Sequence, residues 1–135
     1  MLRILLDGIA MPNQKKETKI QNNGLLAIGT MPNVLAWRQN VGLFRALHNP
    51  DQIVKCGIAG QGDIGLVVGC KITPDMVGRT IGVAVNAEYK TDTGRQSAQQ
   101  KDWQTAFEKR GGVYRVVRSD DDLIGLVNDV ADGRF

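Results

Sequence analysis

Two apolar segments rich in β-branched residues and glycine place the strongest constraint on the fold of this chain. They are "DIGLVVGC" at 63–70 and "TIGVAVNAEYK" at 80–90, with the turn residues Pro74 and Asp75 between them. Charged residues are confined to the ends of these segments, which is typical of strands covered on both faces. We therefore expect both segments to be central strands of a sheet.

The segment that follows these strands has the signature of an α-helix. Ser97 is a favourable N-cap, Gln100 stands at the capping-box position, and Gly111 follows the expected last turn. The apolar face consists of Trp103, Ala106 and Phe107. A strand is then predicted at "VYRVV" (113–117), and a second helix begins after the N-cap Ser119 with Asp122 in its first turn.

The first half of the chain gives weaker signals. Apolar residues at helical spacing predict a helix from Gln14 to about Gly29, and "VLAW" at 34–37 predicts a strand that ends at the 40–42 break. Residues 43–62 are expected to be irregular. The opening "MLRILLDGIA" is interrupted by Asp7 and is too short for a membrane span, so a short edge strand is expected there.

Composition predicts one domain over residues 1–135 and excludes several classes of protein. The 135 residues suffice for one core, and helices alternate with strands, so the expected fold class is α/β, with a mixed β-sheet flanked by helices. Two distant cysteines and one histidine, His48, build neither a zinc site nor a disulfide framework. A reducing cytoplasm is the expected location.

Three charged residues are predicted to meet at one end of the sheet. Asp63 lies between glycines just before one apolar strand, and Glu88 and Lys90 stand two residues apart at the end of the next. If these strands are neighbours, the three side chains converge. Two close carboxylates repel each other unless a cation offsets their charge, and Mg²⁺ or Mn²⁺ accepts such oxygen ligands. The pattern indicates metal-assisted phosphodiester hydrolysis, with Lys90 orienting or deprotonating water.

The same residues resemble a known nuclease motif. "GD" at 62–63 and "EYK" at 88–90 resemble the PD-(D/E)xK core, with Gly62 in the place of proline. The surrounding words, "AWRQNVG" at 36–42, "KCGIAGQGDI" at 55–64 and "GRQSAQQKDW…GGVYRVVRSDDDL" at 94–123, are similar to the VRR-NUC (virus-type replication-repair nuclease) family. The resemblance covers about residues 17–127.

This resemblance implies a single-domain, restriction-endonuclease-like fold and a set of site residues. Glu17, Asp63 and Glu88 would be metal ligands together with the Tyr89 carbonyl. The implied catalytic residues are Asp63, Glu88, Lys90 and the supporting Gln100, which matches a Ser-x-x-Gln-x-x-Trp pattern of the family. The products would carry a 5′-phosphate and a 3′-hydroxyl.

Each of these residues also has an ordinary structural explanation. Glu17 is equally explained as a solvated helix residue, Asp63 as a turn residue, and Gln100 as a capping residue alone. Glu88 and Lys90 could form a surface ion pair of little energetic weight. Trp37 and Trp103 are expected in the core.

The predicted partner is DNA, recognised by shape. Basic residues outnumber acidic ones by 17 to 14 and lie mostly in the first hundred residues, and Arg38, Lys55 and Arg95 are candidate phosphate contacts. "GIAGQGDIG" lacks the Gly-Lys-Ser/Thr of a P-loop, so no nucleotide cofactor is expected.

The predicted function is a Mg²⁺- or Mn²⁺-dependent endonuclease. It would act on four-way junctions like a Holliday-junction resolvase, as a homodimer, at the nucleoid of a bacterial or phage-infected cell. The alternatives are a flap or single-strand-end nuclease that needs a partner, and a DNA-binding module of the same fold without catalysis.

Overall fold

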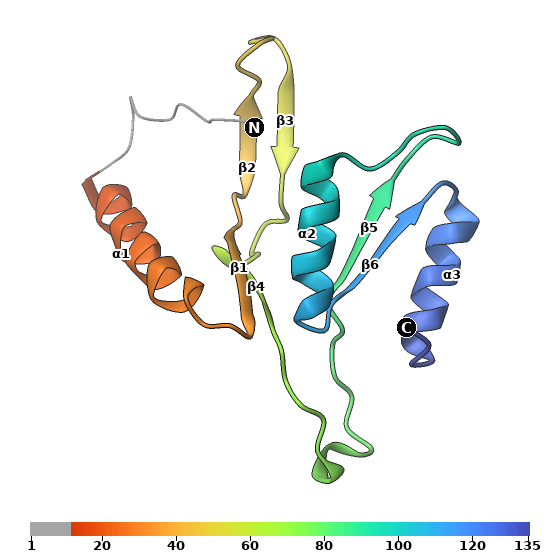
Figure 1. Cartoon of the computed structure of the whole chain (residues 1–135). Helices are drawn as coiled ribbons and strands as arrows, with labels where there is room; N and C mark the ends of the chain where they lie inside the picture. Colours follow the sequence, from red (N-terminus) through yellow and green to blue (C-terminus); the bar gives the residue numbers. More distant parts are fainter. Residues whose placement is uncertain (1–11) are drawn as a thin grey trace. The chain divides into compact units, whose positions relative to one another are not determined.

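The computed structural model describes residues 12–135, and its mixed α/β architecture confirms the predicted class (Figure 1). The helices are α1 (Pro12–Gly29), the 3₁₀ helix η1 (Pro74–Met76), α2 (Ala98–Lys109) and α3 (Asp120–Ala131). The strands are β1 (Val34–Arg38), β2 (Gly42–Arg45), β3 (Ile53–Cys56), β4 (Ile64–Val68), β5 (Val85–Tyr89) and β6 (Val113–Val117). The edge strand predicted within residues 1–10 lies outside the described residues.

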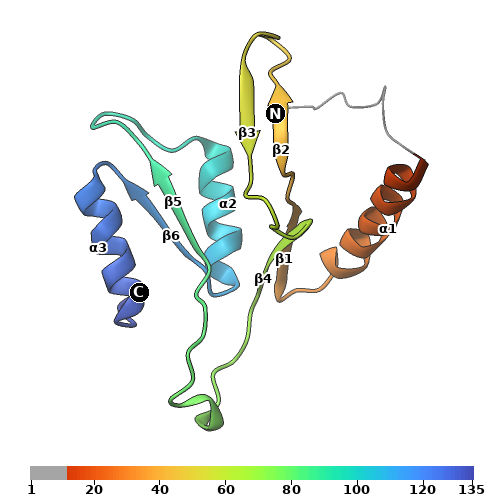
Figure 2. The same ribbon diagram turned by 180° about the vertical axis from the view of Figure 1, so that it is seen from behind.

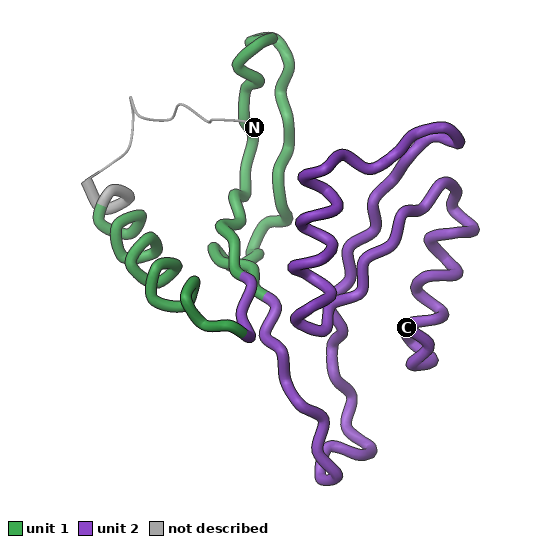
Figure 3. Tube along the Cα trace, in the orientation of Figure 1, with its two compact units in different colours: residues 1–32, 36–66 green, residues 33–35, 67–135 purple. Residues whose placement is uncertain are grey.

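The chain divides into two compact units. One comprises residues 1–32 and 36–66, and the other residues 33–35 and 67–135 (Figure 3). The prediction of one domain over the whole chain stays a prediction. In the part of the chain that is described, no helix has the length and apolar character needed to cross a membrane.

The first unit contains α1 and a β-hairpin. Strands β2 and β3 pair antiparallel from Gly42 opposite Cys56 to Arg45 opposite Ile53. The hairpin closes through Asn49, whose carbonyl accepts a hydrogen bond of 2.9 Å from the Gln52 amide. The expectation of an irregular segment over 43–62 is therefore wrong. Four-residue strands offer too few residues for a clear alternation, although the "HNPD" turn at 48–51 marks the reversal.

Strand β1 pairs with β4, and a glycine makes room for a tryptophan there. The Gln39 amide donates to the Asp63 carbonyl over 2.8 Å, at the start of β4. Trp37 lies directly over Gly65, where an added Cβ would stand 2.6 Å from the indole ring. Trp37 is half-buried, so its expected place in the core is wrong.

The second unit is built on a strand–helix–strand motif. Strands β5 and β6 are parallel, from Val85 opposite Val113 to Tyr89 opposite Val117, and α2 connects them (Figure 2). Helix α3 follows β6, and Leu126 of α3 packs with Val113 and Val117 in a buried cluster. The predicted caps of both helices are present: Ser97 accepts from the Gln100 amide and Ser119 from the Asp122 amide.

The expectation that β5 is a central strand is wrong: within the described residues it pairs with β6 alone, and its two faces differ in burial. Asn86 and Glu88 are half-buried, whereas Val85 and Tyr89 are 38% and 53% exposed. Tyr114 of β6 lies opposite Asn86 on the face that carries α2, while Val113 and Val117 face α3. Strand alternation thus puts the two helices on opposite faces of the pair and turns the polar residues of β5 towards α2.

Candidate active site at the end of β5

The polar face of β5 carries Asn86, Glu88 and Lys90 in alternate positions. All three are half-buried, which follows from the two-residue period of a strand that has α2 on one side. The β5–α2 loop and the N-terminus of α2 continue from this end of the strand. The predicted Glu-x-Lys pair therefore lies where a strand, a loop and a helix start meet.

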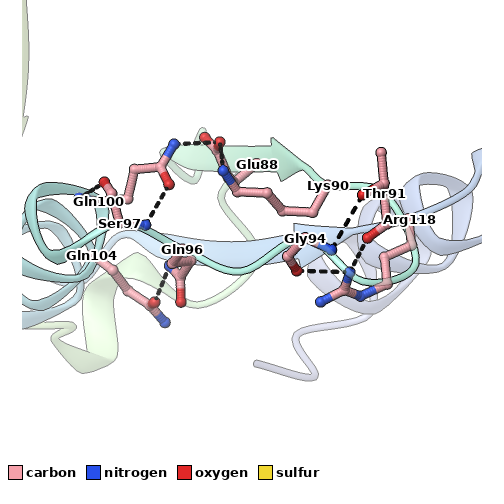
Figure 4. A network of polar contacts seen from close by, with 9 residues as sticks. All are labelled: Glu88, Lys90, Thr91, Gly94, Gln96, Ser97, Gln100, Gln104 and Arg118. Atoms are coloured by element: carbon pink, nitrogen blue, oxygen red, sulfur yellow. Dashed lines mark hydrogen bonds and ion pairs between the residues drawn. The ribbon is translucent and has the colours of Figure 1, made fainter.

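Glu88 is held by two donors on one carboxylate oxygen. Its Oε1 accepts a 2.6 Å hydrogen bond from Nε2 of Gln100 and lies 3.3 Å from Nζ of Lys90 (Figure 4). The side chains of Glu88 and Lys90 are only 28% and 20% exposed, so this is not a freely solvated surface pair. Among the described residues, Oε2 of Glu88 has no hydrogen bond.

Gln100 has two roles at once, as a helix cap and as a partner of Glu88. Its side-chain Oε1 accepts from the Ser97 backbone amide over 2.9 Å, and its backbone amide donates to Oγ of Ser97 over 3.1 Å. Because the side-chain oxygen is committed to the cap, the nitrogen is directed to Glu88. The capping box therefore fixes the donor that orients the carboxylate.

A cleft of about 370 Å³ opens beside Glu88. Trp103 and Gln99 of α2 line it together with Asn86 of β5 and the buried Tyr114 of β6. Nε1 of Trp103 donates to Oδ1 of Asn86 over 2.7 Å, which holds the indole of α2 against a side chain of β5. The expectation that Trp103 belongs to the core is wrong, because it is half-buried and lines this cleft.

Arg118 forms hydrogen bonds with the loop that follows Lys90. Its Nη1 donates to the carbonyl oxygens of Thr91 and of Gly94, the latter over 3.1 Å (Figure 4). The Lys90 amide donates to the Val117 carbonyl over 3.0 Å, which extends the β5–β6 pairing to the lysine itself. Sequence reasoning missed Arg118, since one arginine after a strand gives no signal of the loop it binds.

The predicted residues of the first unit lie apart in sequence and on different elements. Glu17 is exposed on α1 and accepts from Gln21 over 3.4 Å, and Asp63 is exposed just before β4. Arg38 donates to Oδ1 of Asn22 over 2.6 Å, and Lys55 is exposed on β3. Arg38 thus ties β1 to α1, a structural role that the sequence did not indicate.

The sequence predicts that Asp63 and Glu88 converge, but the two residues belong to different units. Glu17 and Asp63 belong to one unit, and Glu88, Tyr89 and Arg95 to the other. Strand β4 has β1 as its hydrogen-bonded partner, and β5 has β6. Convergence of Asp63 with Glu88 stays a prediction. Within each unit taken by itself, the described residues include no group of three His, Cys, Asp or Glu side chains placed to hold a metal ion.

Comparisons with known proteins found no relative of this chain. No protein-family model, no curated protein and no solved structure matches the chain. The similarity of its motifs to VRR-NUC nucleases therefore stays a prediction made from the residues.

Proposed function

We propose that this protein is a metal-dependent DNA endonuclease whose chemistry is centred on Glu88 and Lys90. The observation that carries the proposal is the shielded carboxylate–ammonium pair at the end of β5, with Gln100 on the same oxygen and a cleft beside it. An ordinary surface ion pair needs neither an orienting amide nor an adjoining cleft.

Lys90 has the properties that hydrolysis of a phosphodiester requires. Its ammonium lies 3.3 Å from Oε1 of Glu88, which restricts its position. A compact ammonium next to a bound phosphate offsets the negative charge that grows in the transition state. It can also hold and deliver a proton at Nζ, and Glu88 orients it for either role.

The metal ligand that we propose in the second unit is Glu88. Oε2 of Glu88, which no described residue hydrogen-bonds, is a hard oxygen ligand of the kind that Mg²⁺ and Mn²⁺ prefer. Glu88 and the Tyr89 carbonyl would hold the ion. When bound, such an ion supplies Lewis-acid chemistry: it lowers the pKa of water and offsets phosphate charge.

The sequence resemblance supports DNA, and branched DNA in particular, as the substrate. The motifs at 36–42, 55–64 and 94–123 are similar to those of VRR-NUC nucleases, which have the PD-(D/E)xK fold. The chain has no recognisable motif that reads base sequence, so recognition would depend on DNA shape. We propose four-way junctions as the preferred substrate.

The test is a cleavage panel with the purified full chain. Four-way junctions, flaps, single strands and linear duplexes are incubated with Mg²⁺, with Mn²⁺ and with EDTA. Cleavage that requires a metal and is fastest on junctions is the expected result. Faster cleavage of flaps or single-stranded ends would replace the junction proposal, and DNA binding without cleavage in either metal would identify a binding module.

A further inference from the structure

The cleft beside Glu88 has a composition that the hydrolysis itself does not explain. The proposed chemistry is centred on Glu88 and Lys90, yet the cleft extends from Glu88 to Trp103 and Tyr114. Its volume of about 370 Å³ lies within the range of roughly 300–1,000 Å³ that is usual for sites of small organic groups. The cleft can therefore take a group that is attached to the phosphate and is not itself part of the reaction.

Its aromatic wall is held in place before any ligand binds. The Trp103 indole donates to Asn86 over 2.7 Å, and its ring centroid lies 6.1 Å from that of the buried Phe107 with a tilt of 31°. A ring fixed from two sides loses little conformational freedom when a flat partner stacks on it. Stacking on aromatic side chains is the common way in which proteins bind unpaired bases.

One amide at the cleft remains available to the edge of such a group. Gln100 is committed to Ser97 and Glu88, and Oδ1 of Asn86 is committed to Trp103. Gln99 lines the same cleft, is exposed, and has no side-chain hydrogen bond within the described residues. A carboxamide presents both a donor and an acceptor, which suits the polar edge of a nucleobase.

We propose that this cleft binds one unpaired nucleobase of the DNA strand whose phosphate lies at Glu88 and Lys90. A base inside a duplex stack cannot enter a cleft between a strand and a helix, so the nucleotide must be unpaired or turned out of the stack. This inference rests on the proposed function for the identity of the strand as DNA. It adds a substrate requirement, which is an unpaired nucleotide next to the cleaved bond.

The test compares two DNA molecules that differ by a single base. Each is a labelled branched duplex with one unpaired nucleotide at the branch point, either thymidine or an abasic residue, and binding to the full chain is measured by fluorescence anisotropy in EDTA. The wild type should bind the thymidine form about 5- to 150-fold more tightly, the range that corresponds to stacking of one base. Equal binding of the two forms would overturn the inference.

Two variants test whether the preference for the thymidine form arises in the cleft. Trp103→Leu should bind both DNA molecules with the affinity of the abasic form, and Gln99→Ala should reduce the preference without weakening binding of the abasic form. Gln99 is exposed, so that variant stays informative if Trp103→Leu fails to fold in a circular dichroism melt. A preference that survives intact in Gln99→Ala and in folded Trp103→Leu would place the base elsewhere and refute the inference.

The same assay separates this inference from the nuclease proposal and from a free-nucleotide site. Binding is measured without metal, so a protein that never cleaves but prefers the thymidine form supports the base cleft and refutes only the nuclease. A protein that cleaves DNA but binds the thymidine and abasic forms equally supports the nuclease proposal and refutes the base cleft. Competition by thymidine 5′-monophosphate at the concentration of the branched DNA would show a free-nucleotide pocket and would overturn the DNA assignment.

Discussion

Lys90 is the residue for which the structure permits the sharpest separation of chemistry from folding. Lys90→Ala should lower the cleavage rate by about 10²–10⁴-fold, the usual range for loss of a positioned proton-transfer group, while metal affinity changes less. Single-turnover kinetics over a range of Mn²⁺ concentrations measures both. Lys90→Arg should restore the rate only in part, because a planar fork replaces a compact ammonium.

The matched control for this variant is Lys101→Ala. Lys101 is an exposed lysine on α2, so its removal changes the net charge equally without touching the pair at the end of β5. Loss of metal binding together with unchanged turnover at saturating metal in Lys90→Ala would show a structural ion pair instead of a catalytic lysine.

Asp129 predicts a pH dependence of stability that is separate from the site. Hydrogen bonds from Arg115 and then Arg134, at 2.8 and 3.1 Å, hold the pKa of its carboxyl below the ordinary value of 3.8. A depressed pKa contributes stability that is present above the unfolded value and is lost as pH falls through the folded one. Asp129→Asn should therefore be less stable than the wild type from pH 7 to about pH 4, with the difference shrinking below that.

Urea denaturation of Asp129→Asn at several pH values between 2 and 7 measures this difference. Asp102→Asn, an exposed aspartate on α2, is the control and should show no such convergence. A difference that persists unchanged at the lowest pH would mean that the two arginines do not act through the Asp129 charge.

At the scale of elements, local signals predicted the second unit well. The caps at Ser97 and Ser119 act within one turn of helix, so α2 and α3 could be located from a few adjacent residues. The hairpin of β2 and β3 was missed because pairing between strands of four residues depends on partners along the chain rather than on a pattern within one strand. The same limit led to the wrong prediction of two-sided burial for β5.

The site residues whose contacts lie close together in the sequence could be predicted, and those with distant contacts could not. Glu88 and Lys90 follow from a two-residue spacing, and Gln100 from the capping box. The partnership of Trp103 with Asn86 joins residues 17 positions apart, and that of Arg118 with Thr91 joins residues 27 apart. Such contacts are set by the crossover of α2 between parallel strands, which no local pattern specifies.

Replacing two glycines of the second unit with alanine should change the stability of the protein in opposite directions. A Cβ at Gly112 would lie 2.4 Å from the buried Phe107 ring, so Gly112→Ala should destabilise the protein by about 1–3 kcal/mol. A Cβ at Gly125, within α3, meets nothing within 4 Å, so Gly125→Ala should stabilise it by about 0.5–1 kcal/mol.

Urea denaturation of the two variants tests the packing of α2 and the exposure of α3 together. Each serves as the control for the other, because both add the same methyl group. Equal effects of the two substitutions would contradict the close approach of Phe107 to Gly112.

At the scale of the whole molecule, the proposed junction specificity predicts an assembly with two active sites. A twofold-symmetric homodimer would present one Glu88–Lys90 site to each of two strands of a four-way junction, so nicks should occur in pairs. Light scattering gives the oligomeric state, and a cruciform plasmid that is linearised rather than singly nicked reports paired cleavage. Affinity should fall steeply with salt because phosphate contacts dominate.

A monomer that leaves the cruciform intact but trims flaps would refute the dimer and the junction preference together. That outcome would leave the chemistry of Glu88 and Lys90 in place. Specificity would then reside in a partner protein.

Single-turnover cleavage by Glu88→Gln and by Glu108→Gln, with Mg²⁺ and with Mn²⁺, tests whether Glu88 is essential for catalysis. Both substitutions replace a carboxylate with an amide in the second unit, and the Glu108 side chain accepts a hydrogen bond from Gln104, which is also on α2. Circular dichroism is recorded for both variants, because only a folded variant reports on the chemistry. We expect no cleavage by Glu88→Gln and a wild-type rate for Glu108→Gln. A folded Glu88→Gln variant that cleaves DNA at the wild-type rate would contradict this expectation.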